Sequence, residues 1–195
     1  MKIAVDVDGV LLDLMDTYCE VYNEQFETNY KKSDVTRWDF FEEWEIRERD
    51  AFEIFHKIYE NSSDIPFIDE YALFVLKEIN EIHHVDIVSA RSEQYSVQLG
   101  DTLKSHGIID GIHYQHLILV NEKPYDIKLR LNYDLYIDDN PHLAWAIKER
   151  TEIVLFLYDQ PWNRNINEKN KKNIFRVKNW IDINREIKGL ELLLE

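Results

Sequence analysis

Five short, continuous apolar runs constrain the fold more than any other feature of this sequence. The runs span residues 2–7, 85–89, 117–120, 135–137 and 153–158, and Val, Ile and Leu occupy consecutive positions in them. Strands that are buried on both faces of a parallel sheet have this pattern. Between the runs, apolar residues recur at helical spacing, as at Ala72, Val75, Leu76, Ile79 and Ile82. This alternation predicts an α/β fold with a parallel sheet.

The interval between the first two runs is unusually long. It holds about 75 residues, whereas an ordinary βαβ unit needs only ~30. Two helical stripes and an aromatic patch lie within it, and a turn-forming segment at residues 61–66 closes it. We therefore predict a small helical cap of residues 14–70, inserted after the first strand of a core made of residues 1–13 and 71–195. A chain of 195 residues is long enough for one domain with such an insertion.

Net charge restricts the partners. The chain has 23 Lys and Arg residues against 38 Asp and Glu residues, a formal charge of −15. A field of this sign repels nucleic-acid backbones and anionic membranes, so neither a polymeric nucleic acid nor a membrane is an expected partner. A small phosphate-bearing ligand would need a local cation, from a metal ion or from a placed Lys or Arg.

Cysteine content and hydropathy indicate the cell compartment. Cys19 is the only cysteine, so no internal disulfide can form, and no Cys/His spacing matches a structural zinc site. The N-terminus lacks the apolar segment of a signal peptide, and no run of about 18 apolar residues is present. These features predict a cytoplasmic protein.

Acidic residues follow the first run. Asp6 and Asp8 lie two residues apart, on the same side of an extended chain, and Gly9 allows a sharp turn after them. Ligands of open α/β sheets bind beyond the carboxyl ends of the strands, which is where this pair falls. Taken alone, the pair could equally be a solvated turn.

Polar residues also follow two later runs. Ser89, Ala90 and Arg91 end the second, and taken alone Ser89 is more typical of a helix N-cap. Asp138 and Asp139 end the fourth, where their mutual repulsion favours a shared magnesium ion over a plain cap. Lys128 precedes this pair by ten residues; as an isolated lysine it would be assigned to the surface.

The order of these groups resembles the haloacid dehalogenase (HAD) superfamily of phosphotransferases. An Asp pair, a Ser, a Lys and a second Asp pair follow one another, each near a strand end, and the likeness extends from Met1 to about Tyr158. Within the superfamily, the chain is most similar to the 5'(3')-deoxyribonucleotidases and related bacterial nucleotidases. The motifs that carry this likeness are residues 6–13, residues 36–40, the spacing from Lys128 to Asp139, and residues 158–164. The resemblance implies a HAD-like Rossmannoid core with the cap after its first strand.

The resemblance also implies roles for these residues. Asp6 would attack the phosphorus, and Asp8 would act as general acid and then as general base. Mg²⁺ would bind Asp6, the backbone carbonyl of Asp8, and Asp139, with Asp138 as a direct or water-mediated ligand. The substrate phosphate would be held by the residues of the second and third motifs: Ser89, Ala90, Arg91 and Lys128.

The implied substrate is a small phosphomonoester, most simply a nucleoside monophosphate and in particular a deoxyribonucleotide. Aromatic side chains stack on bases, and the cap offers Trp38, Phe40, Phe41 and Trp44, although each could instead belong to the core of the cap. Another phosphomonoester, such as a sugar phosphate, is the alternative substrate. A phospho-accepting receiver domain is a non-enzymatic alternative, but receivers lack both a cap and an acid at the position of Asp8. Whether the chain forms a homo-oligomer stays open.

Overall fold

A six-stranded parallel sheet forms the centre of the protein. The computed structural model describes residues 1–121, 123–168 and 171–194. The strand order is β3-β2-β1-β4-β5-β6, and each strand pairs with its neighbours in parallel. The strands are β1 (Lys2–Val5), β2 (His84–Ser89), β3 (Leu117–Leu119), β4 (Leu135–Asp138), β5 (Val154–Tyr158) and β6 (Ile174–Val177). The predicted α/β fold with a parallel sheet is thus confirmed.

The edge strand β6 was not among the five predicted strands. It has four residues and includes a charged one, Arg176, so it lacks the continuous apolar run of a central strand. The Arg176 guanidinium has partners nearby, because Nη1 lies 2.9 Å from Asp159 Oδ1 and donates to Asn163 Oδ1 at 2.8 Å. This tertiary contact allows a polar residue within the strand.

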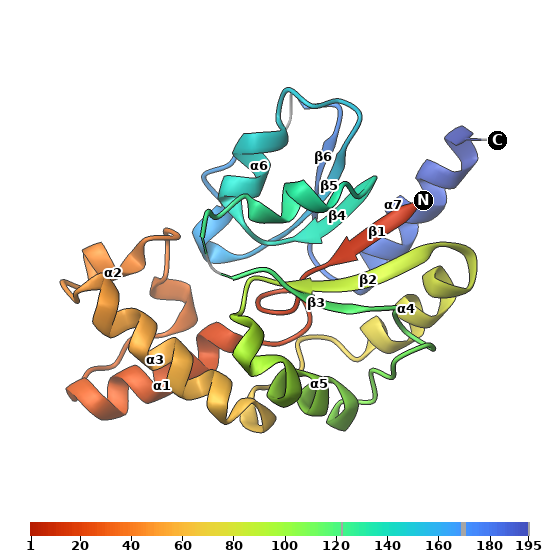
Figure 1. Cartoon of the computed structure of the whole chain (residues 1–195). Coiled ribbons are helices and arrows are strands. Elements are labelled where there is room, and N and C mark those ends of the chain that lie inside the picture. The colour runs from red at the N-terminus through yellow and green to blue at the C-terminus, as the bar shows by residue number, and fades with distance from the viewer. Residues whose placement is uncertain (122, 169–170, 195) are drawn as a thin grey trace.

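Helices cover both faces of the sheet (Figure 1). The α-helices are α1 (Leu14–Phe26), α2 (Phe40–Glu43), α3 (Glu48–Glu60), α4 (Tyr71–Ile82), α5 (Ser96–Ser105), α6 (Pro141–Ile147) and α7 (Trp180–Leu194). Alternate residues of β1 belong to different buried clusters. Ile3 and Val5 pack in one cluster with residues of α4 and α7, whereas Ala4 packs in the other with residues of α6. This burial on both sides explains the continuous apolar runs.

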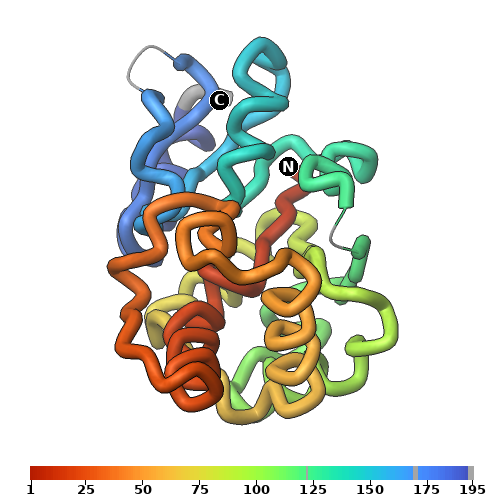
Figure 2. The backbone as a smooth tube through the Cα atoms, turned by 90° about the vertical axis from the view of Figure 1, so that its left-hand side faces the viewer, coloured from red at the N-terminus to blue at the C-terminus, as the bar shows by residue number. Residues whose placement is uncertain are grey.

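The helices between β1 and β2 lie beyond the carboxyl ends of the strands. The strand arrows in Figure 1 point toward α1, α2 and α3, and Figure 2, seen from that side, shows these helices in front of the sheet. One buried cluster runs from Tyr18 and Ile54 of these helices to Val5 and Ile87 of the sheet. The division into a cap of residues 14–70 and a core of residues 1–13 and 71–195 therefore stays a prediction. In the described part of the chain, no helix is both long and apolar enough to span a membrane.

Candidate active site

Three carboxylates converge at the carboxyl edge of the sheet. Asp6 follows β1, and Asp138 and Asp139 lie at the end of the adjacent strand β4, where the Asp6 N–H donates to the Ile137 carbonyl at 2.9 Å. One carboxylate oxygen from each acid lies within 4.8 Å of the other two, and all three residues are buried. The pairing of β1 with β4 thus brings together acids that are more than a hundred residues apart in the chain.

Lys128 lies between two of these acids. It belongs to a short 3₁₀ helix, Ile127–Leu131, and its Nζ is 2.8 Å from Asp6 Oδ1 and 2.7 Å from Asp138 Oδ2. Burial alone would lower the pKa of Lys128, but the charges of Asp138 and Asp6 raise it above its usual value. The buried ammonium therefore stays protonated and fixes the position of the Asp6 carboxylate, which also accepts the Val7 N–H at 2.7 Å.

The three acids carry more negative charge than Lys128 neutralises. Burial, together with the charge of Asp138, raises the pKa of Asp6 to about 7 despite the nearby ammonium. Burial likewise raises the pKa of Asp139 well above its usual value, and the charges of Asp6 and Asp138 add to the effect. A divalent cation would relieve this repulsion, and a set of carboxylate oxygens suits Mg²⁺. The residues present therefore fit the ion.

Of the two acids of β4 and its loop, Asp139 has fewer hydrogen-bond partners than Asp138 and so has more lone pairs available for a metal ion. Both oxygens of Asp138 accept strong bonds, from Lys128 Nζ and from the Asn140 N–H at 2.9 Å. Within the described residues, the side chain of Asp139 accepts one hydrogen bond, from Trp162 Nε1 at 3.1 Å. This difference favours Asp139 as a direct metal ligand.

The segment after β5 holds two acidic loops in place, namely the loop after β1, which includes Asp6 and Gly9, and the loop after β4, which includes Asp139. Gln160 Nε2 donates to the Gly9 carbonyl at 2.6 Å, and Asn163 Nδ2 donates to the Asp139 carbonyl at 2.8 Å. With the Trp162 bond to Asp139, three side chains of one segment thus contact both acidic loops. In the sequence this segment carries part of the family likeness, but no role was predicted for its side chains.

We expect Gly9→Ala to damage the site. Gly9 has a φ of 82°, and a Cβ there would overlap the Asp139 carboxylate. The left-handed backbone alone should cost about 1–2 kcal/mol of stability, and the displaced carboxylate should lower activity as well. Thermal unfolding and phosphate release would measure both effects. Gly189→Ala is the matched control, because that glycine lies in α7 with open space around it; equal losses in the two variants would contradict the interpretation.

Asp8 lies apart from the carboxylate cluster, in an ion pair with Arg91. Arg91 Nη2 and Nε bind the two oxygens of Asp8 at 2.6 and 2.8 Å, and Nη1 donates to Ser62 Oγ at 2.9 Å. The guanidinium also lies 4.4 Å from the centre of the Tyr59 ring, and the Arg91 side chain is fully buried. Arg91 therefore positions Asp8 through its side chain, a role that sequence analysis missed.

Ser89 and its neighbours differ in exposure. Ser89 ends β2, the strand beside β1, and it is fully buried. Its Oγ accepts the Arg91 N–H at 3.2 Å, so in this state that N–H already has a partner. Ala90, Arg91 and Lys128 line the pocket described next, whereas Ser89 does not. Phosphate binding by these four residues stays a prediction.

The acidic site opens onto a pocket with an aromatic wall. Asp6, Asp8 and Asp139 line its polar end. Three of the four aromatic residues proposed from the sequence also line it, namely Trp38, Phe40 and Phe41. Five further aromatic residues line it that the sequence did not assign to the site: Phe52, Phe55, Tyr59, Tyr125 and Trp162.

The fourth predicted aromatic residue, Trp44, is not among the lining residues. It is buried in the helical segment and stacks on Tyr30, with the ring centres 4.0 Å apart and the planes 15° from parallel. Its ring also packs on Tyr22 of α1 and Phe40 of α2, with ring centres 4.8 and 4.9 Å away, so Trp44 belongs to the core of this segment, which is the alternative that the sequence left open.

Comparisons with known proteins agree with this geometry. The model of the family described as "5' nucleotidase, deoxy (Pyrimidine), cytosolic type C protein" matches residues 1–191. A 5'(3')-deoxyribonucleotidase of Bacillus subtilis strain 168 is 25% identical over 190 residues, which cover 95% of this chain and 97% of the relative.

Solved structures share the fold at low sequence identity. A haloacid dehalogenase-like hydrolase, SP0104 of Streptococcus pneumoniae, aligns with a TM-score of 0.67 at 11% identity and covers 97% of both chains. The L-2-haloacid dehalogenase of Xanthobacter autotrophicus aligns with a TM-score of 0.61 at 12% identity, covering 97% of this chain and 98% of its own. The fold is therefore that of the haloacid dehalogenase-like hydrolases, and the chain belongs to the nucleotidase family whose model it matches, which makes it a phosphoric monoester hydrolase.

Proposed function

We propose that the protein is a magnesium-dependent 5'-nucleotidase that dephosphorylates nucleoside monophosphates, in particular deoxyribonucleotides, through an aspartyl-phosphate on Asp6. The observation that carries the proposal is the convergence of Asp6, Asp138, Asp139 and Lys128 at one end of an aromatic pocket. Mg²⁺ bound by Asp6, Asp139 and the Asp8 carbonyl would neutralise charge on the phosphate oxygens.

In the first step, a carboxylate oxygen of Asp6 attacks the phosphorus, and the bond from phosphorus to the ester oxygen breaks. Lys128 suits this reaction because its ammonium contacts the Asp6 carboxylate and faces the pocket. It would stabilise the negative charge that the phosphoryl group carries during transfer. Asp8 donates a proton to the leaving ester oxygen.

In the second step, Asp8 accepts a proton from a water molecule, which attacks the same phosphorus. The bond from phosphorus to Asp6 breaks, and phosphate and the free carboxylate result. Arg91 supports this role of Asp8 by holding both of its oxygens at the pocket wall, in reach of the polar end. The Arg91 contact to Ser62 links this pair to the end of the helical segment 14–70.

The aromatic wall supports a nucleoside as the leaving group. Base stacking on one aromatic ring contributes roughly 1–3 kcal/mol, and Trp38 and Phe41 are partly exposed at this wall. A sugar phosphate, the alternative substrate, has no aromatic ring that could stack on this apolar surface.

A substrate panel tests the proposal. Phosphate release should be measured with Mg²⁺ over the common ribo- and deoxyribonucleoside monophosphates and over several sugar phosphates, with Asp6→Asn as the blank. We expect 5'-nucleotides to have the higher kcat/KM, and deoxyribonucleotides to exceed ribonucleotides. Release from sugar phosphates as fast as from nucleotides would refute the nucleotidase assignment while leaving the phosphatase chemistry intact.

We expect the effect of Asp8→Asn to depend on the leaving group. Nucleotide hydrolysis should slow by about 10²- to 10⁴-fold, because the leaving alkoxide then lacks its proton donor. With 4-nitrophenyl phosphate, whose leaving group needs no proton, the variant should release nitrophenolate in a rapid burst and then turn over slowly. Rapid-mixing absorbance measures the burst. An equal slowing of the burst and of nucleotide phosphorylation would contradict the role of Asp8 as general acid.

A further inference from the structure

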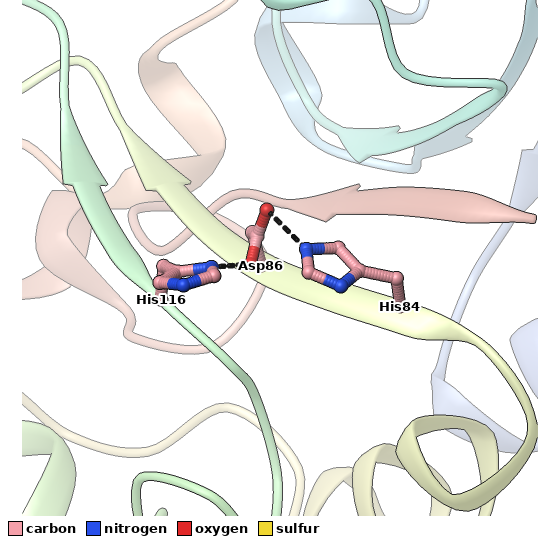
Figure 3. A group of neighbouring side chains, drawn as sticks. All are labelled: His84, Asp86 and His116. Carbon is pink, nitrogen blue, oxygen red and sulfur yellow. Dashed lines mark hydrogen bonds and ion pairs between the residues drawn. The ribbon is translucent and has the colours of Figure 1, made fainter.

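A second group of metal-ligating side chains lies at the opposite end of the sheet. His84 and Asp86 belong to the first half of β2, and His116 immediately precedes β3 (Figure 3). His84 Nε2 is 3.0 Å from Asp86 Oδ2, and His116 Nδ1 is 2.8 Å from Asp86 Oδ1. One ligand atom from each residue lies within 4.8 Å of the other two. The active site is at the other end of β2, beyond Ser89, roughly 10 Å along the strand from Asp86.

We propose that His84, Asp86 and His116 form a second metal site, which binds a borderline divalent transition-metal ion such as Zn²⁺. Two imidazole nitrogens and a carboxylate oxygen are the ligands that such ions prefer, whereas Mg²⁺ prefers oxygen. The proposal is independent of the reaction at the acidic site.

The separation of the ligand atoms is close to what a metal requires. In a tetrahedral site with metal–ligand bonds of about 2.0–2.2 Å, neighbouring ligand atoms lie ~3.3–3.5 Å apart. The two contacts to Asp86 are a few tenths of an ångström shorter, so small side-chain rotations would open the space for an ion. The side chains of His84 and His116 are 39% and 65% exposed, which leaves a path for the ion and room for a water ligand.

The backbone already holds the three residues in register. His84 and Asp86 lie two positions apart on one strand, so their side chains share a face of the sheet. The Ile87 N–H donates to the His116 carbonyl at 2.9 Å, which ties His116 to β2. A bound ion would add a side-chain link between β2 and the three-residue edge strand β3.

Tyr133, which is not a proposed ligand, orients the Asp86 carboxylate. The Tyr133 hydroxyl donates to Asp86 Oδ2 at 2.6 Å, and both groups are buried. Tyr133 is thus an outer donor of the kind that commonly fixes metal-bound carboxylates. The sequence shows no zinc pattern because these ligands come from two separate segments and include no cysteine.

The test is Zn²⁺ binding to the full chain without a polyhistidine tag, measured by calorimetry and by competition with a chromophoric chelator. Saturating Mg²⁺ is added to compete for the acidic site, and Asp139→Asn provides a second way to remove the contribution of that site. We expect one equivalent of Zn²⁺ to bind, and both His116→Gln and His84→Gln to weaken the affinity by more than about 10-fold. His106→Gln, a partly buried histidine elsewhere, is the matched control and should bind as the wild type does.

Two further measurements separate a metal site from a purely hydrogen-bonded cluster. Tyr133→Phe removes the outer hydroxyl but no ligand, and it should weaken Zn²⁺ binding about 10- to 100-fold. Co²⁺ in place of Zn²⁺ should give visible ligand-field bands that His116→Gln lacks, while circular dichroism shows that the variant is folded. If no stoichiometric Zn²⁺ binds in saturating Mg²⁺, or if both histidine variants bind it unchanged, the proposal is wrong and the cluster is only a set of ion pairs.

Discussion

Asp6→Asn is expected to abolish turnover while leaving the fold intact. An amide cannot attack phosphorus as a carboxylate does, and removal of a nucleophile from a catalytic unit typically costs at least about 10⁴-fold in kcat. Phosphate release from a 5'-nucleotide measures the loss. Mass spectrometry of acid-quenched samples should find a phosphorylated chain for the wild type and none for the variant.

The pKa of Asp6 also predicts how Asp6→Asn changes the stability of the protein. Burial raises the pKa of Asp6 from 3.8 to about 7, so the folded protein binds the Asp6 proton more tightly than the unfolded chain does. The stability that this proton contributes is fully present below pH 3.8 and is lost as the pH rises through about 7. A neutral Asn avoids this loss. In metal-free buffer above about pH 7, the variant should therefore unfold at a temperature no lower than that of the wild type.

Asp101→Asn, at an exposed position of α5, is the control for Asp6→Asn and should change neither activity nor stability. Near-wild-type turnover by Asp6→Asn would remove Asp6 as the nucleophile. A variant that is inactive but unfolded would show instead that the buried pair with Lys128 is essential for folding.

Removal of Mg²⁺ is expected to silence the enzyme reversibly. Without the ion, three buried carboxylates have a single ammonium between them, and the phosphate of the substrate would add further negative charge. Activity should disappear in a chelator and return when Mg²⁺ is added in excess. Full activity in the chelator would contradict the magnesium requirement.

The two acids of β4 should differ in their effect on Mg²⁺. Asp139→Asn removes the carboxylate with free ligand capacity, so the Mg²⁺ concentration for half-maximal activity should rise strongly. Asp138→Asn should have the smaller effect on this concentration, because Asp138 already binds Lys128 and the Asn140 N–H. Titrations of activity against Mg²⁺ compare the two variants, and an equal rise in both would contradict Asp139 as the preferred ligand.

Much of the core could be predicted because burial on both faces leaves a direct pattern in the sequence. The five apolar runs correspond to β1 to β5, with ends that differ by a few residues. Strand β6 escaped prediction because Arg176 is neutralised by Asp159, a contact that only the folded chain makes. The helix α4 was predicted from its spacing, and Ala72, Val75, Leu76 and Ile79 of the predicted stripe are buried. Ile82, the last residue of the stripe, is exposed at the end of the helix.

The candidate site could be predicted only in part. The sequence places Asp6, Asp138 and Asp139 at strand ends, and this was enough to predict that the three acids lie close together, as they do. Side-chain partners were not predictable in the same way. Trp44 and Phe41 belong to the same aromatic patch of the sequence, yet one packs on Tyr30 and the other lines the pocket.

The sequence by itself determined where the five strands β1 to β5 lie and that the acidic motifs follow two of them, because continuous apolar runs reflect burial on both faces and the chain order of the motifs is read directly. Only the tertiary structure decided that Arg91 binds Asp8, that Trp162 and Gln160 hold the acidic loops, and that His116 lies beside Asp86. These contacts join segments that are distant in the chain. Their geometry depends on strand order and on the packing of whole elements, which no local pattern contains.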